Sequence, residues 1–148
     1  MRVRLSTLVP GVAPEAALAW WFDFHEGATD HDFLGVGVRR RILARSEAEV
    51  EMEDRAPLFR ERVRAWREPG AVAFEGSNTV SRFRGAYRFT AEADGTRIAL
   101  DAEIDLRGAL RLGLPVARPL ARAILRRDLE GHGEEMAREL GQAGSQTR

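Results

Sequence analysis

The sequence predicts an α+β domain in which a curved, seven-stranded antiparallel sheet wraps on a long C-terminal helix, with two short helices after the first strand. Charged or polar residues alternate with apolar ones over residues 2–9, the period of a strand with one buried face. Between residues 35 and 107, six further stretches are separated by turn signals such as Pro69-Gly70 and Asp94-Gly95. Beyond Arg107 the apolar residues change to helical spacing.

Length and composition indicate one globular domain. The chain has 148 residues, 44% of them hydrophobic and 31% charged, which suffices to enclose a single core. We expect a ligand-binding domain over residues 1–140 and a disordered tail over 141–148. No apolar run is long enough to cross a bilayer, so we expect no stable membrane insertion. The first ten residues lack the apolar stretch of a signal peptide, which favours a cytoplasmic location.

The residue types exclude several functions. The chain has no cysteine, which removes disulfides, thiolate nucleophiles and cysteine-ligated metal sites. All 23 basic residues are arginine, so Schiff-base catalysis is excluded as well. They are balanced by 23 acidic residues, which argues against a general nucleic-acid-binding surface. We predict no cofactor and no nucleic-acid partner, and the composition leaves the oligomeric state open.

Two short helices are expected after the first strand. Pro14 suits a first helical position, and an apolar stretch up to Phe24 follows it. The successive residues Trp20, Trp21 and Phe22 cannot share one helix face, and we place Trp20 and Trp21 near the mouth of a cavity. The spacing of Thr29 and Asp32 resembles a capping box and predicts a second helical turn ending near residue 34.

The charge pattern of the strand-rich region predicts its registers. A two-residue loop at Asp94-Gly95 pairs residues whose numbers sum to 189. On the solvent-exposed face we expect the pairs Arg88 with Asp101 and Arg84 with Asp105. On the buried face we expect Phe89 with Leu100, Tyr87 with Ala102 and Gly85 with Ile104. The Pro69-Gly70 turn likewise pairs Ala65 with Phe74 inside and Arg64 with Glu75 outside.

An exterior charge ladder is expected on the strands that follow residue 35. Glutamates occupy one face of a strand, flanked by arginines of the preceding and following strands: Glu47, Glu49, Glu51 and Glu53 between Arg39, Arg41, Arg45 and Arg60, Arg62, Arg64. Interleaved acids cancel the field of such a ladder, so we interpret it as a solvated structural face rather than a phosphate-binding surface.

The C-terminal region is expected to form one long helix. Its apolar stripe consists of Ala117, Ala121, Leu125, Leu129, His132, Met136 and Leu140. Either Pro115 or Pro119 can mark its start, because proline is tolerated in the first turn but breaks a helix interior.

Small residues on the inward parity of the strands predict an internal cavity for an apolar ligand. They are Ala44, Ala48, Ala65, Gly76, Gly85 and Ala102. The stripe of the C-terminal helix also includes alanine, so two facing surfaces lack bulk and leave space of the size ligand pockets have, about 300–1,000 Å³. The alternative is that the glycines only bend the strands. The expected lining residues are Arg40, Tyr87, His132, Phe74, Phe89, Leu100, Ala102, Leu125, Leu129 and Met136.

Four polar residues have a functional and a structural interpretation. Arg40 lies on the apolar parity of its strand, so its partner is either a ligand anion or an internal acid such as Glu61 or Asp23. The Tyr87 hydroxyl contacts either the ligand or a backbone carbonyl. His132 is either a cavity-facing base or a satisfied core residue. His31 is placed at the cavity mouth, and no spacing supports a metal site there.

The last predicted hairpin and helix resemble a known superfamily. The residues that carry the resemblance are Gly85-Ala-Tyr-Arg-Phe-Thr-Ala-Glu-Ala-Asp-Gly-Thr-Arg-Ile98 and Arg126-Arg-Asp-Leu-Glu130. Together with the element order, they resemble the helix-grip (SRPBCC) superfamily of birch-pollen-allergen-like proteins, START-related lipid-transfer domains and bacterial polyketide cyclases. The resemblance implies a helix-grip fold with a ligand cavity and no particular reaction.

Three functions remain open from the sequence. The first is binding or transport of a small hydrophobic molecule such as a lipid, isoprenoid, quinone or polyketide-like compound. The second is a cyclase or dehydratase, in which Arg40, Tyr87 and His132 orient and deprotonate a bound carbonyl compound. The third is a protein-interaction module. No residue pattern amounts to a catalytic signature, so no catalytic residue is assigned.

Overall fold

The computed structural model describes residues 1–33, 36–57, 59–108 and 113–145, and the side chains of 28–33, 36, 114 and 142–145 lie outside that description. The elements are β1 (Arg2–Pro10), α1 (Pro14–Trp21), β2 (Gly27–Phe33), β3 (Val36–Arg45), β4 (Glu49–Ala56), β5 (Phe59–Glu68), β6 (Ala71–Ser77), β7 (Ser81–Glu92), β8 (Gly95–Leu106) and α2 (Leu114–Ser145).

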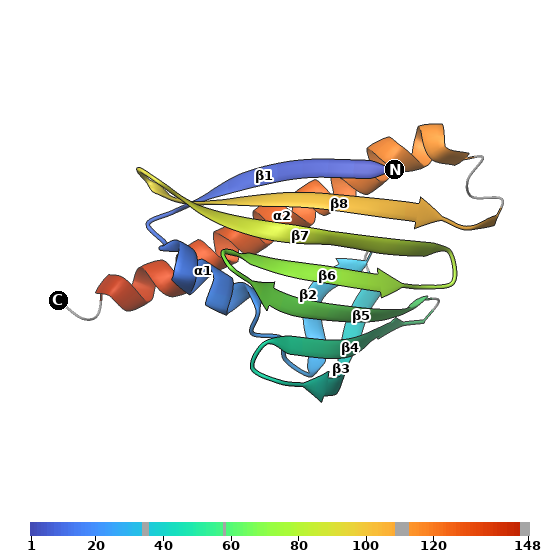
Figure 1. Cartoon of the computed structure of the whole chain (residues 1–148), viewed down its shortest axis with the longest axis horizontal. Helices are drawn as coiled ribbons and strands as arrows, with labels where there is room; N and C mark the ends of the chain where they lie inside the picture. The colour runs from blue at the N-terminus through green and yellow to red at the C-terminus, as the bar shows by residue number, and fades with distance from the viewer. Residues whose placement is uncertain (34–35, 58, 109–112, 146–148) are drawn as a thin grey trace.

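The strands form one antiparallel sheet that curves around α2, which confirms the predicted helix-grip fold (Figure 1). Strands β2 to β8 form a meander, and β1 joins β8 at the far edge. Helix α1 follows β1, and α2 packs most closely on β1 and α1. Within the described part, no helix combines the length and apolarity needed to cross a membrane.

The second short helix was predicted wrongly. Residues Gly27–Phe33 form β2, which pairs with β3 from Gly27 opposite Arg40 to Phe33 opposite Val36, and the sheet therefore has eight strands instead of seven. An isolated helical turn is marginal in water, whereas pairing with a neighbouring strand satisfies the backbone groups. The capping-box spacing alone could not reveal that partner strand.

One predicted hairpin register is confirmed and the other is shifted. At Pro69-Gly70 the predicted pairs Ala65–Phe74 and Arg64–Glu75 are present. In the β7–β8 hairpin Glu92 pairs with Gly95, so paired numbers sum to 187 and every predicted pair is shifted by two residues. Tyr87 thus lies opposite Leu100 rather than Ala102. A shift of two keeps each side chain on its face, so the predicted inside and outside remain correct.

The charge ladder lies on the convex face as predicted, but β3 provides only part of the expected flanking, with Arg41 opposite Glu53. Arg60, Arg62 and Arg64 of β5 bind the three glutamates of β4, namely Glu53, Glu51 and Glu49. On the β3 side, Arg39 lies opposite Arg55, and Arg45 instead donates to the backbone oxygen of Phe24. The expected flanking by β3 is therefore wrong for these two arginines.

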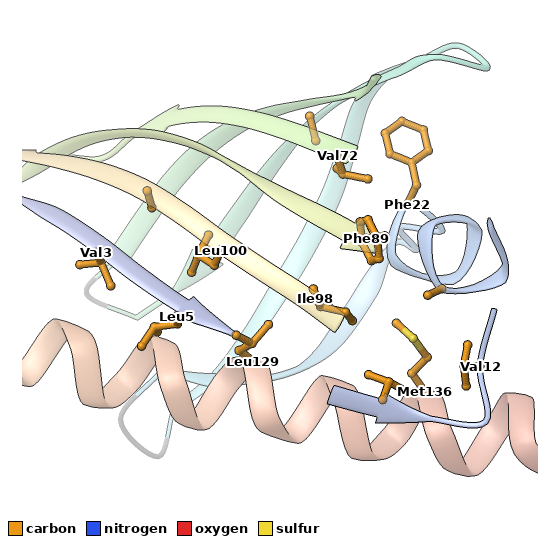
Figure 2. Packing of buried hydrophobic residues seen from close by; sticks show 14 of the residues in the cluster. Val3, Leu5, Val12, Phe22, Val72, Phe89, Ile98, Leu100, Leu129 and Met136 are labelled. Atoms are coloured by element: carbon orange, nitrogen blue, oxygen red, sulfur yellow. The ribbon is translucent and has the colours of Figure 1, made fainter. Parts of the chain in front are cut away.

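The apolar core lies where α1, α2, β1 and β8 meet. Figure 2 shows Leu5, Ile98, Leu129 and Met136 packed between the sheet and α2. Gly133 of α2 faces β1 directly, and a Cβ atom added there would lie 3.3 Å from Thr7 Cγ2 and 3.4 Å from Val9 Cγ2. The missing side chain therefore permits the helix to approach the strand closely.

Helix α2 begins before both prolines. It starts at Leu114, so Pro115 occupies its first turn and Pro119 lies inside it. It continues to Ser145 and includes residues 141–145 of the segment expected to be a disordered tail; residues 146–148 lie outside the described part.

Replacing Gly133 with leucine should separate α2 from β1. Overpacking of this kind typically costs about 1–3 kcal/mol, so the free energy of unfolding should fall, as measured by denaturant titration. Gly131 is the matched control, because a Cβ there meets nothing within 4 Å, and Gly131→Leu should gain up to about 1 kcal/mol of helix propensity. Equal effects of both changes would show that the close approach at Gly133 is unimportant.

Candidate functional site

The concave face of the sheet presents four rows of side chains that run across the strands. The tyrosine row is Val72, Tyr87 and Leu100; the phenylalanine row is Ala65, Phe74, Gly85 and Ala102; the middle row is Met52, Val63, Gly76, Phe83 and Ile104; the polar row is Arg40, Asp54 and Glu61. Because alternate residues along a strand share a face, neighbouring rows are about 7 Å apart. The face is therefore apolar in its middle and polar toward one end.

The small residues do not all leave space on this face. Phe74 lies over Gly85, and Phe83 lies over Gly76, each ring coming within 3 Å of where a Cβ atom would be. The space beside these two glycines is therefore filled by aromatic rings. It is not empty, as the cavity prediction expected, and the glycines do more than bend the strands. Ala65 and Ala102 are buried inward as predicted.

The prediction that Ala44 and Ala48 face inward is wrong. The bulge between Ile42 and Ala44 pairs Ala44 with Glu51 on the convex face, and Ala48 is exposed in the turn before β4. The alternating pattern could not show the bulge, which changes the face of every later residue of β3.

Tyr87 is the most distinctive polar group of the concave face. Its ring centroid lies 4.6 Å from that of Trp21 and 5.3 Å from that of Phe74. Its hydroxyl makes no hydrogen bond with a described residue. Every fully buried side-chain polar atom of the described residues has a hydrogen-bond partner, so this hydroxyl is not fully buried. The hydroxyl therefore keeps access to solvent within an aromatic surround. Burial, and secondarily the charge of Asp128, raise the pKa of Tyr87 well above its usual range, so the phenol is neutral and can donate a hydrogen bond.

His132 lies beside the same aromatic group. Its ring centroid is 5.3 Å from Trp21 and 6.2 Å from Trp20. Nδ1 is 2.8 Å from the backbone oxygen of Asp128, one helical turn earlier. In the tautomer that donates from Nδ1 to this oxygen, the ring lone pair lies on Nε2. The half-buried ring is thus held in one orientation next to the face that carries Tyr87.

Trp20 and Trp21 of α1 connect the sheet with α2. Trp21 contacts both Tyr87 and Phe89 of β7. Trp20 donates from Nε1 to Glu139 Oε2 of α2 over 2.6 Å. The two indoles hold α1 between the other elements. Their predicted place at a cavity mouth stays a prediction.

Arg40 has an internal acid as its partner, and that acid is Asp54. Arg40 Nε and Nη2 donate to the two oxygens of Asp54 over 2.8 and 2.7 Å, and the side chains are only 11% and 10% exposed. The guanidinium also lies 5.2 Å from the ring centroid of Phe24. Neither Asp23 nor Glu61, the acids proposed from the sequence, forms this pair. Asp54 was missed because its strand partner depends on the β3–β4 register.

The third member of the polar row, Glu61 of β5, contacts the β6–β7 turn. Glu61 is opposite Asp54 in the register and accepts a hydrogen bond from Asn78 Nδ2 over 3.4 Å. The Asn78 side-chain oxygen in turn accepts from the Ser81 hydroxyl over 3.1 Å. Among the described residues, this end of the concave face therefore combines Arg40, Asp54 and Glu61 with neutral polar groups.

The other predicted lining residues divide between the face and the core. Phe74 and Leu125 are half-buried, whereas the remaining five are buried in the core cluster: Phe89, Leu100, Ala102, Leu129 and Met136. Five fully packed core side chains are poor candidates for direct ligand contact. The side chain of His31 lies outside the described residues.

Metal chemistry has no support in the described part of the chain. His25 Nε2 lies 3.1 Å from Asp23 at an exposed position, and no group of three potential ligands occurs among the described residues.

Two open grooves lie mainly on the convex side. One, of about 570 Å³, is lined by Gly37, Arg39, Arg40, Arg41 and residues 55–57. The other, of about 840 Å³, runs over the charge ladder between Glu51 and Arg107. Neither is the predicted internal cavity, which stays a prediction.

Known proteins share this architecture. The sequence profile of a family described as polyketide cyclase / dehydrase and lipid transport matches residues 2–140. A protein from Thermus thermophilus has 17% sequence identity and a TM-score of 0.68, with 95% of this chain and 99% of that chain covered. The Zhui aromatase/cyclase from a Streptomyces species has 16% identity and a TM-score of 0.69, with 95% of each chain covered. At such identities the likeness shows the fold alone. No curated protein sequence matches the chain.

Replacing Arg40 with methionine should destabilise the protein even without ligand. The change leaves Asp54 as an unpaired charge at 10% exposure, and breaking a buried pair costs about 3 kcal/mol. Thermal melts measure this loss. The exposed Arg39, changed to methionine, is the control and should cost under about 0.5 kcal/mol. Adding Asp54→Leu to Arg40→Met should restore most of the stability; equal melts for both single variants would contradict the pairing.

The pKa of Tyr87 can be read directly, because it is the only tyrosine in the chain. In unfolded protein the phenol should ionise near pH 10, while in folded protein the phenolate absorbance should appear only at higher pH. A pKa raised by folding means that stability is fully present below about pH 10 and is lost as pH rises further. Titration of the native protein near pH 10 would contradict the buried environment of Tyr87.

Proposed function

Because the chain belongs to the polyketide cyclase/dehydrase and lipid transport family, we propose that it binds a small, uncharged hydrophobic molecule on the concave face, between the sheet and α2. Half-buried apolar side chains support this location, since they keep some exposure: Ile42, Val63, Phe74, Phe83 and Ile104 on the concave face, and Leu125 on α2. Such residues gain contacts when an apolar ligand covers them.

The observation that carries the proposal is the Tyr87 hydroxyl. A phenol surrounded by Trp21 and Phe74, with no hydrogen-bond partner among the described residues, requires water or a ligand group beside it. A ligand carbonyl or hydroxyl oxygen meets that requirement, because the neutral phenol donates. The site is thus suited to oxygenated apolar molecules.

The rows suggest the length and polarity of the ligand. On β7, Tyr87 and Ser81 are six residues apart, which corresponds to about 20 Å along the strand. Apolar side chains fill the rows between them. An extended molecule with an apolar body and polar groups at its ends fits this pattern.

The charges favour a ligand without a carboxylate. Arg40 is neutralised by Asp54, and Glu61 adds a further acid to the polar row. A bound anion would meet the Asp54 carboxylate beside a guanidinium that is already engaged. Quinones, isoprenoids and polyketide-like molecules therefore fit better than fatty acids.

A cyclase or dehydratase is the second candidate, favoured by the grouping of Tyr87 and His132 around Trp21. In this proposal His132 Nε2 removes a proton from the carbon next to a ligand carbonyl. The Tyr87 hydroxyl donates to the carbonyl oxygen as charge develops on it. Arg40 has no part in this version, since Asp54 occupies its guanidinium.

Two probes and three variants test the binding site. Pyrene reports the apolar space and a hydroxyanthraquinone adds carbonyl oxygens; both can be followed by quenching of tryptophan fluorescence. Val63→Trp fills the middle row and should abolish binding of both probes, while Val80→Trp, at an exposed turn, should change neither. Tyr87→Phe should weaken only the hydroxyanthraquinone, by about 5- to 10-fold, because one hydrogen bond is lost.

The outcomes separate the three functions. Equal binding by Val63→Trp and the unaltered protein would place the ligand elsewhere. Failure of both probes to bind the unaltered protein would favour a protein-interaction module. Turnover of a linear polyketide mimic, seen by mass spectrometry and lost in His132→Gln while binding persists, would favour the enzyme.

A further inference from the structure

The first half of α2 has an unusual surface. Val116 is 74% exposed and Leu120 is 55% exposed, the two highest values among the large apolar residues described. Leu120 precedes the buried Leu129 by nine residues, about two and a half turns, so it points away from the sheet. Val116 lies one turn before Leu120 on that outer side. The helix therefore carries an apolar patch, Val116 and Leu120, opposite its buried face.

The same half of α2 is rich in arginine, and Arg127, two turns after Leu120, lies on the side of the patch. Residues 114–127 include Arg118, Arg122, Arg126 and Arg127 and no acid, whereas residues 128–140 contain five acids and one arginine. All four arginines are exposed, and none forms an ion pair with a described residue. On the convex face, by contrast, arginines such as Arg62 and Arg84 are bound to glutamates.

The arginines of residues 114–127 have no acid within the same segment to compensate them. The amino end of a helix is the positive end of its dipole and is normally stabilised by acids, yet the first turn of α2 has none. The uncompensated positive end of the dipole and the four arginines therefore both contribute positive potential, which an external negative partner would offset.

We propose that the first half of α2, residues 114–127, docks on the surface of an anionic lipid membrane. A basic helix with an exposed apolar side lies at the boundary between headgroups and acyl chains. Nucleic acid would match the arginines but offers no surface to Val116 and Leu120. A second copy would match the apolar patch but would bring two sets of four arginines together. In Figure 1 the first turns of α2 extend past the start of β1, so the sheet does not obstruct this approach.

Vesicle sedimentation tests the docking on the whole protein, without any hydrophobic ligand. The protein should bind vesicles of mixed phosphatidylcholine and phosphatidylglycerol, and it should bind pure phosphatidylcholine at least tenfold more weakly. Raising the salt from about 0.1 to about 1 M shortens the Debye length from about 10 to about 3 Å and should largely release it.

Matched variants separate the electrostatic and the apolar contributions to membrane binding. Each arginine near an anionic surface contributes a factor of about five, so Arg126→Gln with Arg127→Gln should weaken binding about 25-fold. The control is Arg82→Gln with Arg88→Gln, which removes the same charge from exposed β7 positions and should change binding less than twofold. Val116→Gln with Leu120→Gln should weaken binding at least fivefold, and the exposed Val80→Gln should not. Circular dichroism checks that each variant folds.

Four outcomes would overturn the proposal. They are equal binding to neutral vesicles, equal losses in the test and control variants, DNA binding that needs the arginines but not the apolar pair, and dimerisation that needs the apolar pair. Pyrene binding is measured in solution without vesicles, so failure of docking and failure of the binding proposal are distinguishable.

Discussion

The close approach of α2 to β1 is the contact on which the rest of the structure depends. Gly133 brings the helix against Thr7 and Val9, and Leu129 and Met136 on either side of it are buried in the core cluster. This contact determines where the helix crosses the sheet. The helix then places His132 beside the α1 tryptophans. A bulkier residue at position 133 would displace the core and the candidate site together, because packed interiors transmit such shifts.

The antiparallel pleat gives the concave face its chemistry. Alternate side chains share a face, so aromatic, apolar and polar rows follow one another along the strands. Glycines in two rows permit the rings of Phe74 and Phe83 to approach the neighbouring strands closely. The aromatic lining is therefore built from pairs of glycine and phenylalanine, and the accessible group within it is the Tyr87 hydroxyl. A ligand would meet rings and a hydrogen-bond donor rather than a bare aliphatic wall.

Charge is compensated very differently in three parts of the protein. On the convex face, exposed arginines and glutamates neutralise one another across strands β4 and β5. Inside, Arg40 and Asp54 form a two-bond pair that leaves little positive charge for a ligand. Along α2, the basic and acidic halves stay separate. The first two arrangements are satisfied within the chain, whereas the third is left for a partner, and that difference motivates the proposed membrane contact.

The sequence by itself determined the fold class, the strand faces and the long helix, because alternation and helical spacing are local properties. It also predicted the Pro69-Gly70 register, where turn chemistry and opposite charges agree. Only the tertiary structure decided that residues 27–33 pair as β2, that a bulge turns Ala44 outward, and that Asp54 is the partner of Arg40. Each of these depends on which strand lies alongside, and strand neighbours are set by long-range packing that no local pattern records. For the same reason the grouping of Tyr87, Trp21 and His132 could not be predicted, since three separate elements bring those side chains together.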